Sequence, residues 1–314
     1  MRIVMYGNFL VDYCTEVHHA KTLESMGYQV LRMQETTTRT ETVLMESMRS
    51  DMLVWIHSHG FKNIGRFQMD EVLRRLKGAG IPTVAYHLDL YLGLQRWRDY
   101  EHSPYMQVEH FFTVDKLMAD WFNENTEVKG HYLPAGVFDQ EAYINQAPTQ
   151  NANDVIFVGS RGYHPEWDYR PKLVDWLRST YGSRFTHVGP DGDTGVVRGD
   201  ALNRIYANSK VAVGDTLCLN FDYPYYWSDR LTETLGRGGF LIHPRIKGLD
   251  EYYDDRVHLV MYDYDDFDQL KELIDHYCES DGEREQIRRA GHEHVKANHT
   301  YKQRWEAIIK ELGL

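Results

Sequence analysis

The chain has 314 residues, of which 42% are hydrophobic, and a formal net charge of −12 at pH 7. This length and apolar content suffice for one large domain or two medium domains with full cores, and two domains are favoured. The negative charge argues against extensive non-specific binding to nucleic acid, which clustered Lys and Arg drive, although a local basic groove stays open.

The sequence contains no apolar run near twenty residues, so no transmembrane segment is expected. The N-terminal segment MRIVMYGNF enters a strand without the charged head and long apolar stretch of a signal peptide, and a cytoplasmic protein is predicted. Cys14, Cys218 and Cys278 lie far apart and form no CxxC pair. Neither a disulfide framework nor a zinc site is therefore indicated.

The first half of the chain alternates short apolar runs with amphipathic helices. Strands are predicted for RIVMYG, YQVLRM, MLVWIHS, IPTVAYHL and HFFTVD, and helices for residues 15–26 and 67–77. This alternation is typical of a parallel sheet with helices on both faces. The polar stretch QAPTQNAN, residues 146–153, contains a proline and lacks periodicity, which indicates a linker.

The same pattern restarts after this linker. Strands are predicted for NDVIFVGS, RFTHVG, KVAVGD, FLIHP and HLVMY, and helices for residues 171–181, 202–207 and 266–278, before a helical tail. We expect two Rossmann-like domains, residues 1–148 and 149–299, with a helix over residues 300–314 in a position to pack back on the first. Neither contains GxGxxG, which argues against a dinucleotide-dependent dehydrogenase.

Two stretches of the second half are candidate anion-binding segments. The strand FVGS ends at Gly159, Ser160 and Arg161, whose backbone N–H groups and guanidinium could bind a phosphate. The alternative is an ordinary strand-to-helix turn with a solvated Arg161.

The second stretch, WSDRLTETLGRGGFLIHP, predicts a short helix capped by Ser228 and ended by glycines. Arg230 stands in the first turn, where acidic residues are usual, so a bound anion is an economical explanation. Arg230 could instead form an i,i+3 ion pair with Glu233.

In the first half, polar side chains follow two predicted strands. WIHSHGF places His57 and His59 at one strand end, and AYHLDLY places His87 and Asp89 at another. These groups are suited to proton transfer near neutral pH, but they could equally be satisfied polar residues at strand ends. His57 and His59 lack a third metal ligand by spacing. The DxD-like run Asp191-Gly192-Asp193 is interpreted as a glycine-rich turn.

The span from about Asp154 to Trp305 resembles the group 1 glycosyltransferases, in particular the CgeB-like branch. The matching segments are DVIFVGS, VVRGDALNRIYANSKVAVGD, SDRLTETLGRGGFLIHP and HTYKQR, and the most specific is the pattern R-x-x-E-x-x-x-x-G-G-hydrophobic from Arg230 to Phe240. The resemblance implies a GT-B fold, with two Rossmann-like domains facing across a cleft and the C-terminal one binding a nucleotide sugar. It implies transfer of a sugar from a UDP- or GDP-sugar to an unidentified acceptor: a glycan precursor, a small metabolite or a hydroxymethylated nucleic-acid base.

Carried over residue by residue, the resemblance implies that Glu233 accepts the ribose hydroxyls. Arg161 and Arg230, with the amides from Ser228 to Thr232, would neutralise the diphosphate. Two further positions, in VVRGD, would lie near the nucleobase: Arg198 and Gly199.

The chain departs from the family pattern at Tyr225. Many relatives carry a second Glu at this place, eight residues before the ribose-binding one, where it contacts the donor sugar. The sugar and the retention of stereochemistry are therefore left open. Tyr225 and Tyr226 could stack on a sugar or base, or pack between the two domains.

Enzymes of this fold neutralise the diphosphate with helix dipoles and basic groups, so the resemblance implies no metal ion and no other cofactor. Two alternatives stay open. One is a nucleotide-sugar 2-epimerase on the same fold, and the other is a catalytically inert nucleotide-sugar sensor, which Tyr225 in place of Glu keeps in consideration.

Overall fold

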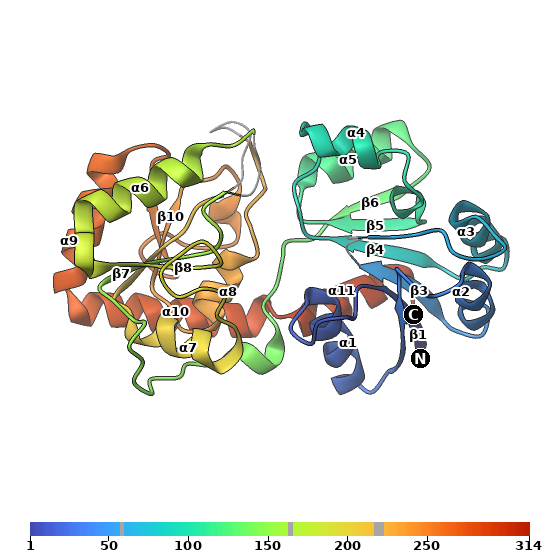
Figure 1. Cartoon of the computed structure of the whole chain (residues 1–314), viewed down its shortest axis with the longest axis horizontal. Coiled ribbons are helices and arrows are strands. Elements are labelled where there is room, and N and C mark those ends of the chain that lie inside the picture. The colour runs from blue at the N-terminus through green and yellow to red at the C-terminus, as the bar shows by residue number, and fades with distance from the viewer. Residues whose placement is uncertain (57–59, 163–165, 217–222) are drawn as a thin grey trace. The chain divides into compact units, whose positions relative to one another are not determined.

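The structure is a computed structural model that describes residues 1–56, 60–162, 166–216 and 223–314. The chain divides into two compact units, one formed by residues 1–134 and 301–314 and the other by residues 135–300. Each unit is a parallel sheet with helices on both faces (Figure 1). The predicted class of two Rossmann-like α/β domains is thereby confirmed. Across the described ranges, no helix combines the length and apolar character needed to cross a bilayer.

In its described residues the first unit has a six-stranded parallel sheet in the order β2-β1-β3-β4-β5-β6. Its strands are β1 (Arg2–Gly7), β2 (Gln29–Gln34), β3 (Met52–Ile56), β4 (Thr83–His87), β5 (His110–Thr113) and β6 (Lys129–Tyr132). All residues of β3, β4 and β5 are buried, because helices cover both faces of the sheet.

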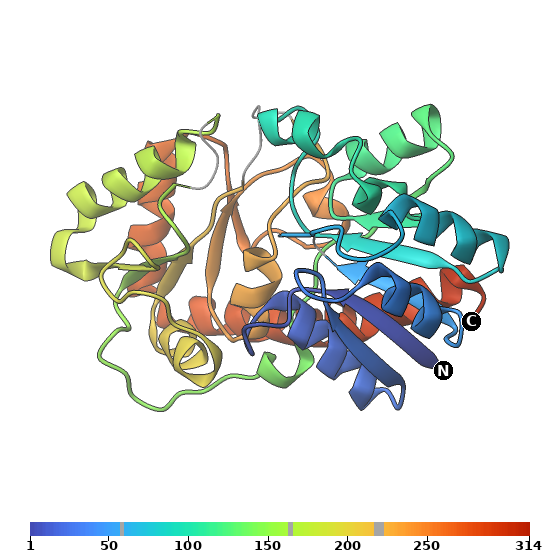
Figure 2. The same ribbon diagram turned by 45° about the vertical axis from the view of Figure 1, so that its right-hand side comes forward.

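Six helices of the first unit cover this sheet in the described residues: α1 (Thr15–Ser25), α2 (Thr40–Ser47), α3 (Met69–Gly78), α4 (Gln95–Tyr100), α5 (Lys116–Asn125) and α11 (Tyr301–Leu312). Helices α1 and α11 lie on one face of the sheet, and α4 and α5 lie on the other (Figures 1 and 2). Two hydrogen bonds of the C-terminal helix α11 attach it to the rest of the first unit. Trp305 Nε1 donates to Nδ1 of His19 over 3.1 Å, and Arg304 Nε donates to the Pro134 carbonyl over 2.6 Å.

In its described residues the second unit has a five-stranded parallel sheet in the order β11-β10-β9-β7-β8. Its strands are β7 (Val155–Val158), β8 (Phe185–Val188), β9 (Val211–Val213), β10 (Leu241–Pro244) and β11 (Val260–Tyr262). Its helices are α6 (Tyr169–Tyr181), α7 (Gly199–Asn208), α8 (Arg230–Gly236), α9 (Phe267–Glu279) and α10 (Asp281–Asn298). Helices α6 and α9 lie on one face of this sheet, and α7 and α10 lie on the other (Figure 1).

The chain enters the second unit earlier than the linker at residues 146–153 implied, because residues 135–148 are tied to α7. The side-chain amide of Asn203 donates to the carbonyls of Glu141 and Tyr143, each over 2.9 Å. Asn208 of the same helix donates to the carbonyl of Ala147 over 3.0 Å. These bonds place the segment with the second unit, although in sequence it precedes the predicted boundary.

Candidate functional site

The strand order of the second unit creates a switch point between β7 and β9. From β7 the chain crosses to β8 on one side, and it then returns to place β9 on the other side. The carboxyl ends of β7 and β9 are therefore neighbours whose connections run in opposite directions, which is where open α/β sheets bind ligands. Gly159 directly follows β7, and Asp215 lies two residues beyond β9.

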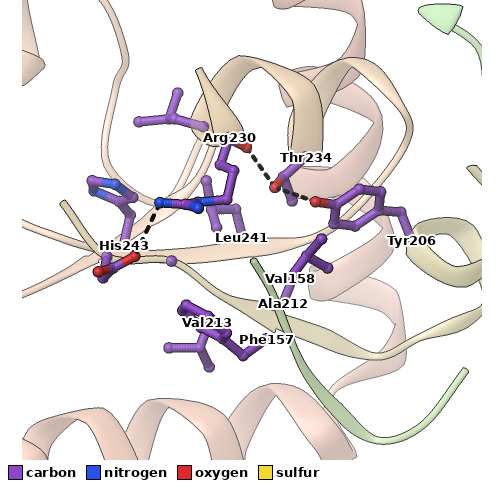
Figure 3. A pocket seen from close by; sticks show the side chains of 12 residues that line it. Phe157, Val158, Tyr206, Ala212, Val213, Arg230, Thr234, Leu241 and His243 are labelled. Atoms are coloured by element: carbon purple, nitrogen blue, oxygen red, sulfur yellow. Dashed lines mark hydrogen bonds and ion pairs between the residues drawn. The ribbon is translucent and has the colours of Figure 1, made fainter. Parts of the chain in front are cut away.

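A narrow pocket opens at this switch point (Figure 3). Apolar residues at the strand ends form much of its wall, and its acidic and basic lining side chains are Asp215, Arg230 and His243. The described residues enclose a cavity of about 10 Å³, which is room for about one water molecule. The pocket is thus too small for a whole nucleotide.

A buried ion pair lies beside this pocket. Arg170, at the start of α6, donates from Nε to Oδ2 of Asp215 over 2.8 Å, and both side chains are at most 1% exposed. Arg170 also donates from Nη1 to the carbonyl of Ser160 over 3.2 Å. Burial would raise the pKa of Asp215, but the guanidiniums of Arg170 and Arg230 lower it below its usual value, so the carboxylate is ionised at neutral pH.

Arg230, the first residue of α8, contacts the same carboxylate. Its Nη2 lies 3.7 Å from Oδ1 of Asp215, which is an ion pair without a hydrogen bond (Figure 3). Its guanidinium also lies against the backbone of Gly159, where a Cβ would stand 2.6 Å from Nη1. The Arg230 side chain is 22% exposed, so it is the part of the cluster that a ligand can reach.

Glu233 lies one turn after Arg230 but does not pair with it. Its Oε1 is 3.6 Å from Nη2 of Arg237, one turn further along α8, and its side chain is 30% exposed. The i,i+3 pair considered as an alternative is therefore not the arrangement in the structure, where Arg230 pairs with Asp215 instead. The Glu233 carboxylate keeps enough exposure to accept a hydrogen bond from a ligand.

The capping role predicted for Ser228 is wrong. Helix α8 begins at Arg230, and Asp229 already has helical dihedral angles of φ −52° and ψ −26°. The Ser228 carbonyl, and not its hydroxyl, accepts the hydrogen bond from the N–H of Leu231 over 3.2 Å. The buried Ser228 Oγ bonds to no other group among the described residues. Thr232 is buried as well and donates from Oγ1 to the Asp229 carbonyl over 2.8 Å.

The structure places Arg161 at the predicted strand end, but its side chain points to α6. Its Nε donates to Oδ1 of Asp175 over 3.1 Å, and the side chain is 44% exposed. Arg198 and Gly199 form the start of α7, where Gly199 has a φ of +60° and Arg198 is exposed. Arg198 donates from Nη1 to the neighbouring Val197 carbonyl over 3.0 Å.

The two tyrosines before α8 have different environments. Tyr226 is buried in the second unit and packs edge-on against Tyr223. Tyr225 is half-buried, has a left-handed φ of +51° and donates its hydroxyl to the Glu251 carboxylate. This bond raises the pKa of Tyr225. A carboxylate therefore lies beside the position where the family pattern has its second Glu.

The candidates of the first unit are less completely defined. His57 and His59 lie outside the described residues, so their prediction is neither supported nor contradicted. Asp89 lies two residues beyond β4, and its Oδ2 is 3.7 Å from Nη1 of Arg96.

The DxD-like run Asp191-Gly192-Asp193 is a turn, as predicted. Asp193 accepts the His187 N–H over 2.7 Å, and the N–H of Gly192 bonds back to the Gly189 carbonyl over 3.0 Å. In the part of the chain that the structure describes, no three His, Cys, Asp or Glu side chains group as a metal site.

Three side chains of the pocket region are absent from the sequence-based candidates: Arg170, Asp215 and His243. Asp215 could have been selected from the sequence, because a carboxylate directly after an apolar strand lies at the edge of a parallel sheet where ligands bind. His243 is buried within β10, with Nδ1 2.9 Å from the Pro244 carbonyl. Burial lowers its pKa to about 4, so its imidazole is neutral at physiological pH.

Comparisons with known proteins agree with this fold. Residues 170–310 match a family model described as glycosyl transferase-like. This match covers α6, α8 and the switch-point pocket except for the end of β7. A search of the curated proteins found no match to the sequence.

Solved structures of glycosyltransferases share the fold over the whole chain. Anabaena Alr3699/HepE, solved with UDP and glucose, is 11% identical, and the alignment covers 99% of this chain and 100% of that one at a TM-score of 0.64. An alpha-glucosyltransferase, solved with UDP-glucose and DNA containing an abasic site, is 11% identical, with 100% of both chains covered and a TM-score of 0.71. Sucrose-phosphate synthase from Thermosynechococcus elongatus is 11% identical, covers 100% of this chain and 97% of its own, and has a TM-score of 0.58. The two-domain GT-B fold is therefore established, whereas the CgeB-like branch stays a prediction.

Proposed function

We propose that this protein is a glycosyltransferase that moves a sugar from a nucleoside diphosphate sugar to an acceptor. The observation that carries the proposal is that Arg230 and Glu233 stand together on the first turn of α8, beside the switch point of the sheet. Arg230 offers a guanidinium to the diphosphate, and the partly exposed Glu233 offers a carboxylate to the ribose.

Catalysis in this proposal consists mainly of stabilising the departing diphosphate, where the largest negative charge develops. Arg230 is already at the carboxyl edge of the sheet. For Arg161 to take part, its guanidinium has to leave Asp175, which costs little because that ion pair is exposed. Helix α8 has only seven residues, so we assign the main electrostatic role to the arginines and not to the helix dipole.

The donor we favour is a UDP-sugar over a GDP-sugar, because two of the structural neighbours were solved with UDP and glucose or with UDP-glucose. Neither comparison points to an epimerase. For the acceptor we keep a glycan precursor, a small metabolite and a hydroxymethylated base, and one structural neighbour was solved with DNA containing an HMU base. We assign proton transfer from the acceptor to His57, His59 or Asp89.

Calorimetric titration with UDP, GDP and UDP-glucose tests the donor side of the proposal. We expect micromolar binding of UDP that is the same in EDTA as in magnesium, because arginines and not a metal ion neutralise the phosphates. Absence of binding by UDP and GDP would sink the proposed function, and loss of binding in EDTA would overturn its metal independence.

Release of UDP from UDP-glucose tests the transfer step. We expect slow release without acceptor and faster release when the true acceptor is present, so DNA with and without hydroxymethyluracil is compared with simple sugars. Conversion of the donor to an isomer without any acceptor would favour epimerisation and contradict transfer.

A further inference from the structure

The two oxygens of Asp215 contact different arginines. Oδ2 accepts a hydrogen bond from Nε of Arg170 over 2.8 Å, whereas Oδ1 lies 3.7 Å from Nη2 of Arg230. Arg170 is itself fixed on a second side by its bond to the Ser160 carbonyl. One carboxylate oxygen is therefore anchored in the interior, and the other is directed at the arginine that remains reachable from outside.

Buried polar groups of this cluster keep unused hydrogen-bonding capacity. Arg170 and Asp215 are fully buried, and the two guanidiniums of Arg170 and Arg230 share the Asp215 carboxylate. Among the described residues, four buried polar atoms of the same region have no hydrogen-bond partner: Arg170 Nη2, Asp215 Oδ1, Ser228 Oγ and His243 Nε2. Such groups are normally satisfied by protein, water or a ligand.

Resting on the glycosyltransferase proposal, we infer that Asp215 is a positioning residue that holds the Arg230 guanidinium in the orientation needed to bind the diphosphate. Asp215 does not touch the ligand in this assignment, and it acts through Arg230. The backbone of Gly159 lies against the guanidinium on another side. Nη1 fits there because Gly159 has no side chain. Arg230 is thereby held from two strands, β7 and β9, while its own helix supplies the third attachment.

The substitution Asp215→Asn tests this assignment, because it keeps the shape of the side chain and removes the charge. Removing a negative charge beside a phosphate site should by itself tighten UDP binding. If the guanidinium of Arg230 is no longer held in place, UDP binding should weaken instead. We expect the affinity for UDP to fall by about 10-fold or more, since misplaced binding groups are costly. Affinity for uridine, followed by NMR, should stay unchanged because it has no phosphate.

Asp154→Asn is the matched control. Asp154 also lies between two cations, with Oδ2 2.7 Å from Nε of Arg184 and Oδ1 3.0 Å from Nζ of Lys210, but it precedes β7 and so lies at the opposite edge of the sheet. We expect Asp154→Asn to bind UDP like the wild-type protein. If Asp215→Asn binds UDP as tightly as this control, or more tightly, the positioning role is overturned.

Asp215→Asn leaves Arg170 buried without its partner, so it can fail to fold. The double substitution Arg170→Met with Asp215→Leu removes both buried charges, a change that folded proteins often tolerate. We expect the same loss of UDP affinity in this folded variant, and wild-type affinity there overturns the inference. A wild-type protein that binds neither UDP nor GDP refutes the proposed function itself, whereas wild-type binding with unaffected variants refutes only the role of Asp215.

Discussion

Glu233 is the side chain whose role separates a nucleotide site from an ordinary helix surface. If it accepts two ribose hydroxyls, its charge-assisted hydrogen bonds contribute roughly 1.5–3 kcal/mol, and Glu233→Ala should weaken UDP binding by about 10–100-fold. If it only pairs with Arg237, from which it is 3.6 Å away, the substitution costs a few tenths of a kcal/mol in stability, and UDP affinity holds. Calorimetric titration of both proteins with UDP decides between the two.

The ligand analogue 2′,3′-dideoxy-UDP is the control for Glu233. Wild-type protein should lose affinity for it, and the Ala variant should show no further loss relative to UDP. Equal wild-type affinity for the two nucleotides would remove Glu233 from the ribose site.

Gly159 is a residue at which an added methyl group would enter the candidate site. Its φ of +141° disfavours other residues, and an added Cβ would lie 2.6 Å from Nη1 of Arg230. Gly159→Ala should therefore displace the guanidinium and weaken UDP binding by about 10-fold, as well as destabilise the fold by about 1–3 kcal/mol. The affinity is measured by calorimetry and the stability by urea unfolding.

Gly182→Ala separates backbone strain from displacement of Arg230. Gly182 also has a positive φ, of +52°, but nothing lies within 4 Å of the position of its Cβ. It should lose stability by a similar amount and keep its affinity for UDP. A loss of affinity in both variants would mean that strain, and not the position of Arg230, causes the effect.

At the scale of single residues, the exposed residues of the site could be predicted from the sequence better than the buried ones. Arg230 and Glu233 stand three apart in one segment, so a local pattern was enough to select them. Arg170 and Asp215 are 45 residues apart, and only the parallel packing of β7 and β9 with α6 brings them together. A buried ion pair between distant segments leaves no periodic signal in the sequence.

At the scale of elements, α7 holds residues 135–148, the segment with which the second unit begins. Asn203 is fully buried, its amide donates to two carbonyls of that segment, and its Oδ1 accepts from Nη1 of Arg237 over 2.7 Å. Asn203→Ala leaves the buried Nη1 of Arg237 and two partly buried carbonyls without this partner and should lower the free energy of unfolding by about 2–4 kcal/mol. Urea unfolding followed by circular dichroism measures the change.

Asn208→Ala is the comparison for that prediction within the same helix. Asn208 donates to the Ala147 carbonyl of the same segment, but it is exposed and water can replace its amide. We expect a loss under about 1 kcal/mol. Equal losses in the free energy of unfolding at the two positions would show that burial of the amide and its partners does not set the cost of the substitution.

The elements that could be predicted are those with continuous apolar runs. The runs of β1, β3, β4 and β7 are buried on both faces, so composition alone marks them. Strand β6, with the sequence KGHY, has no such run and is a strand because it pairs with β5 at the edge of the sheet. Helix α2 is short and only partly apolar, which is why its pattern did not predict it.

At the scale of the whole molecule, each unit contains a buried histidine that should make stability depend on pH. Burial lowers the pKa of His19, in the first unit, to about 3, and that of His243, in the second, to about 4. The unfolded chain takes up these protons near pH 6.5, whereas the folded chain resists them. Stability is therefore complete above about pH 6.5 and is lost as the pH falls toward the folded pKa values.

His19→Gln isolates the contribution of the first unit. The wild-type slope below pH 6.5 contains about 1.4 kcal/mol per pH unit from each such histidine, so the variant should have a slope smaller by about this amount. Gln keeps an acceptor for Nε1–H of Trp305, which now donates to His19 Nδ1, so the loss of packing at neutral pH is limited. Urea titrations between pH 5 and pH 7.5 give the slopes. His102→Gln is the control, because that ring is 90% exposed, so its replacement should leave the slope unchanged. Identical slopes for wild type and His19→Gln would mean that the folded first unit admits a proton at His19, which its full burial against Tyr301 and Trp305 should prevent.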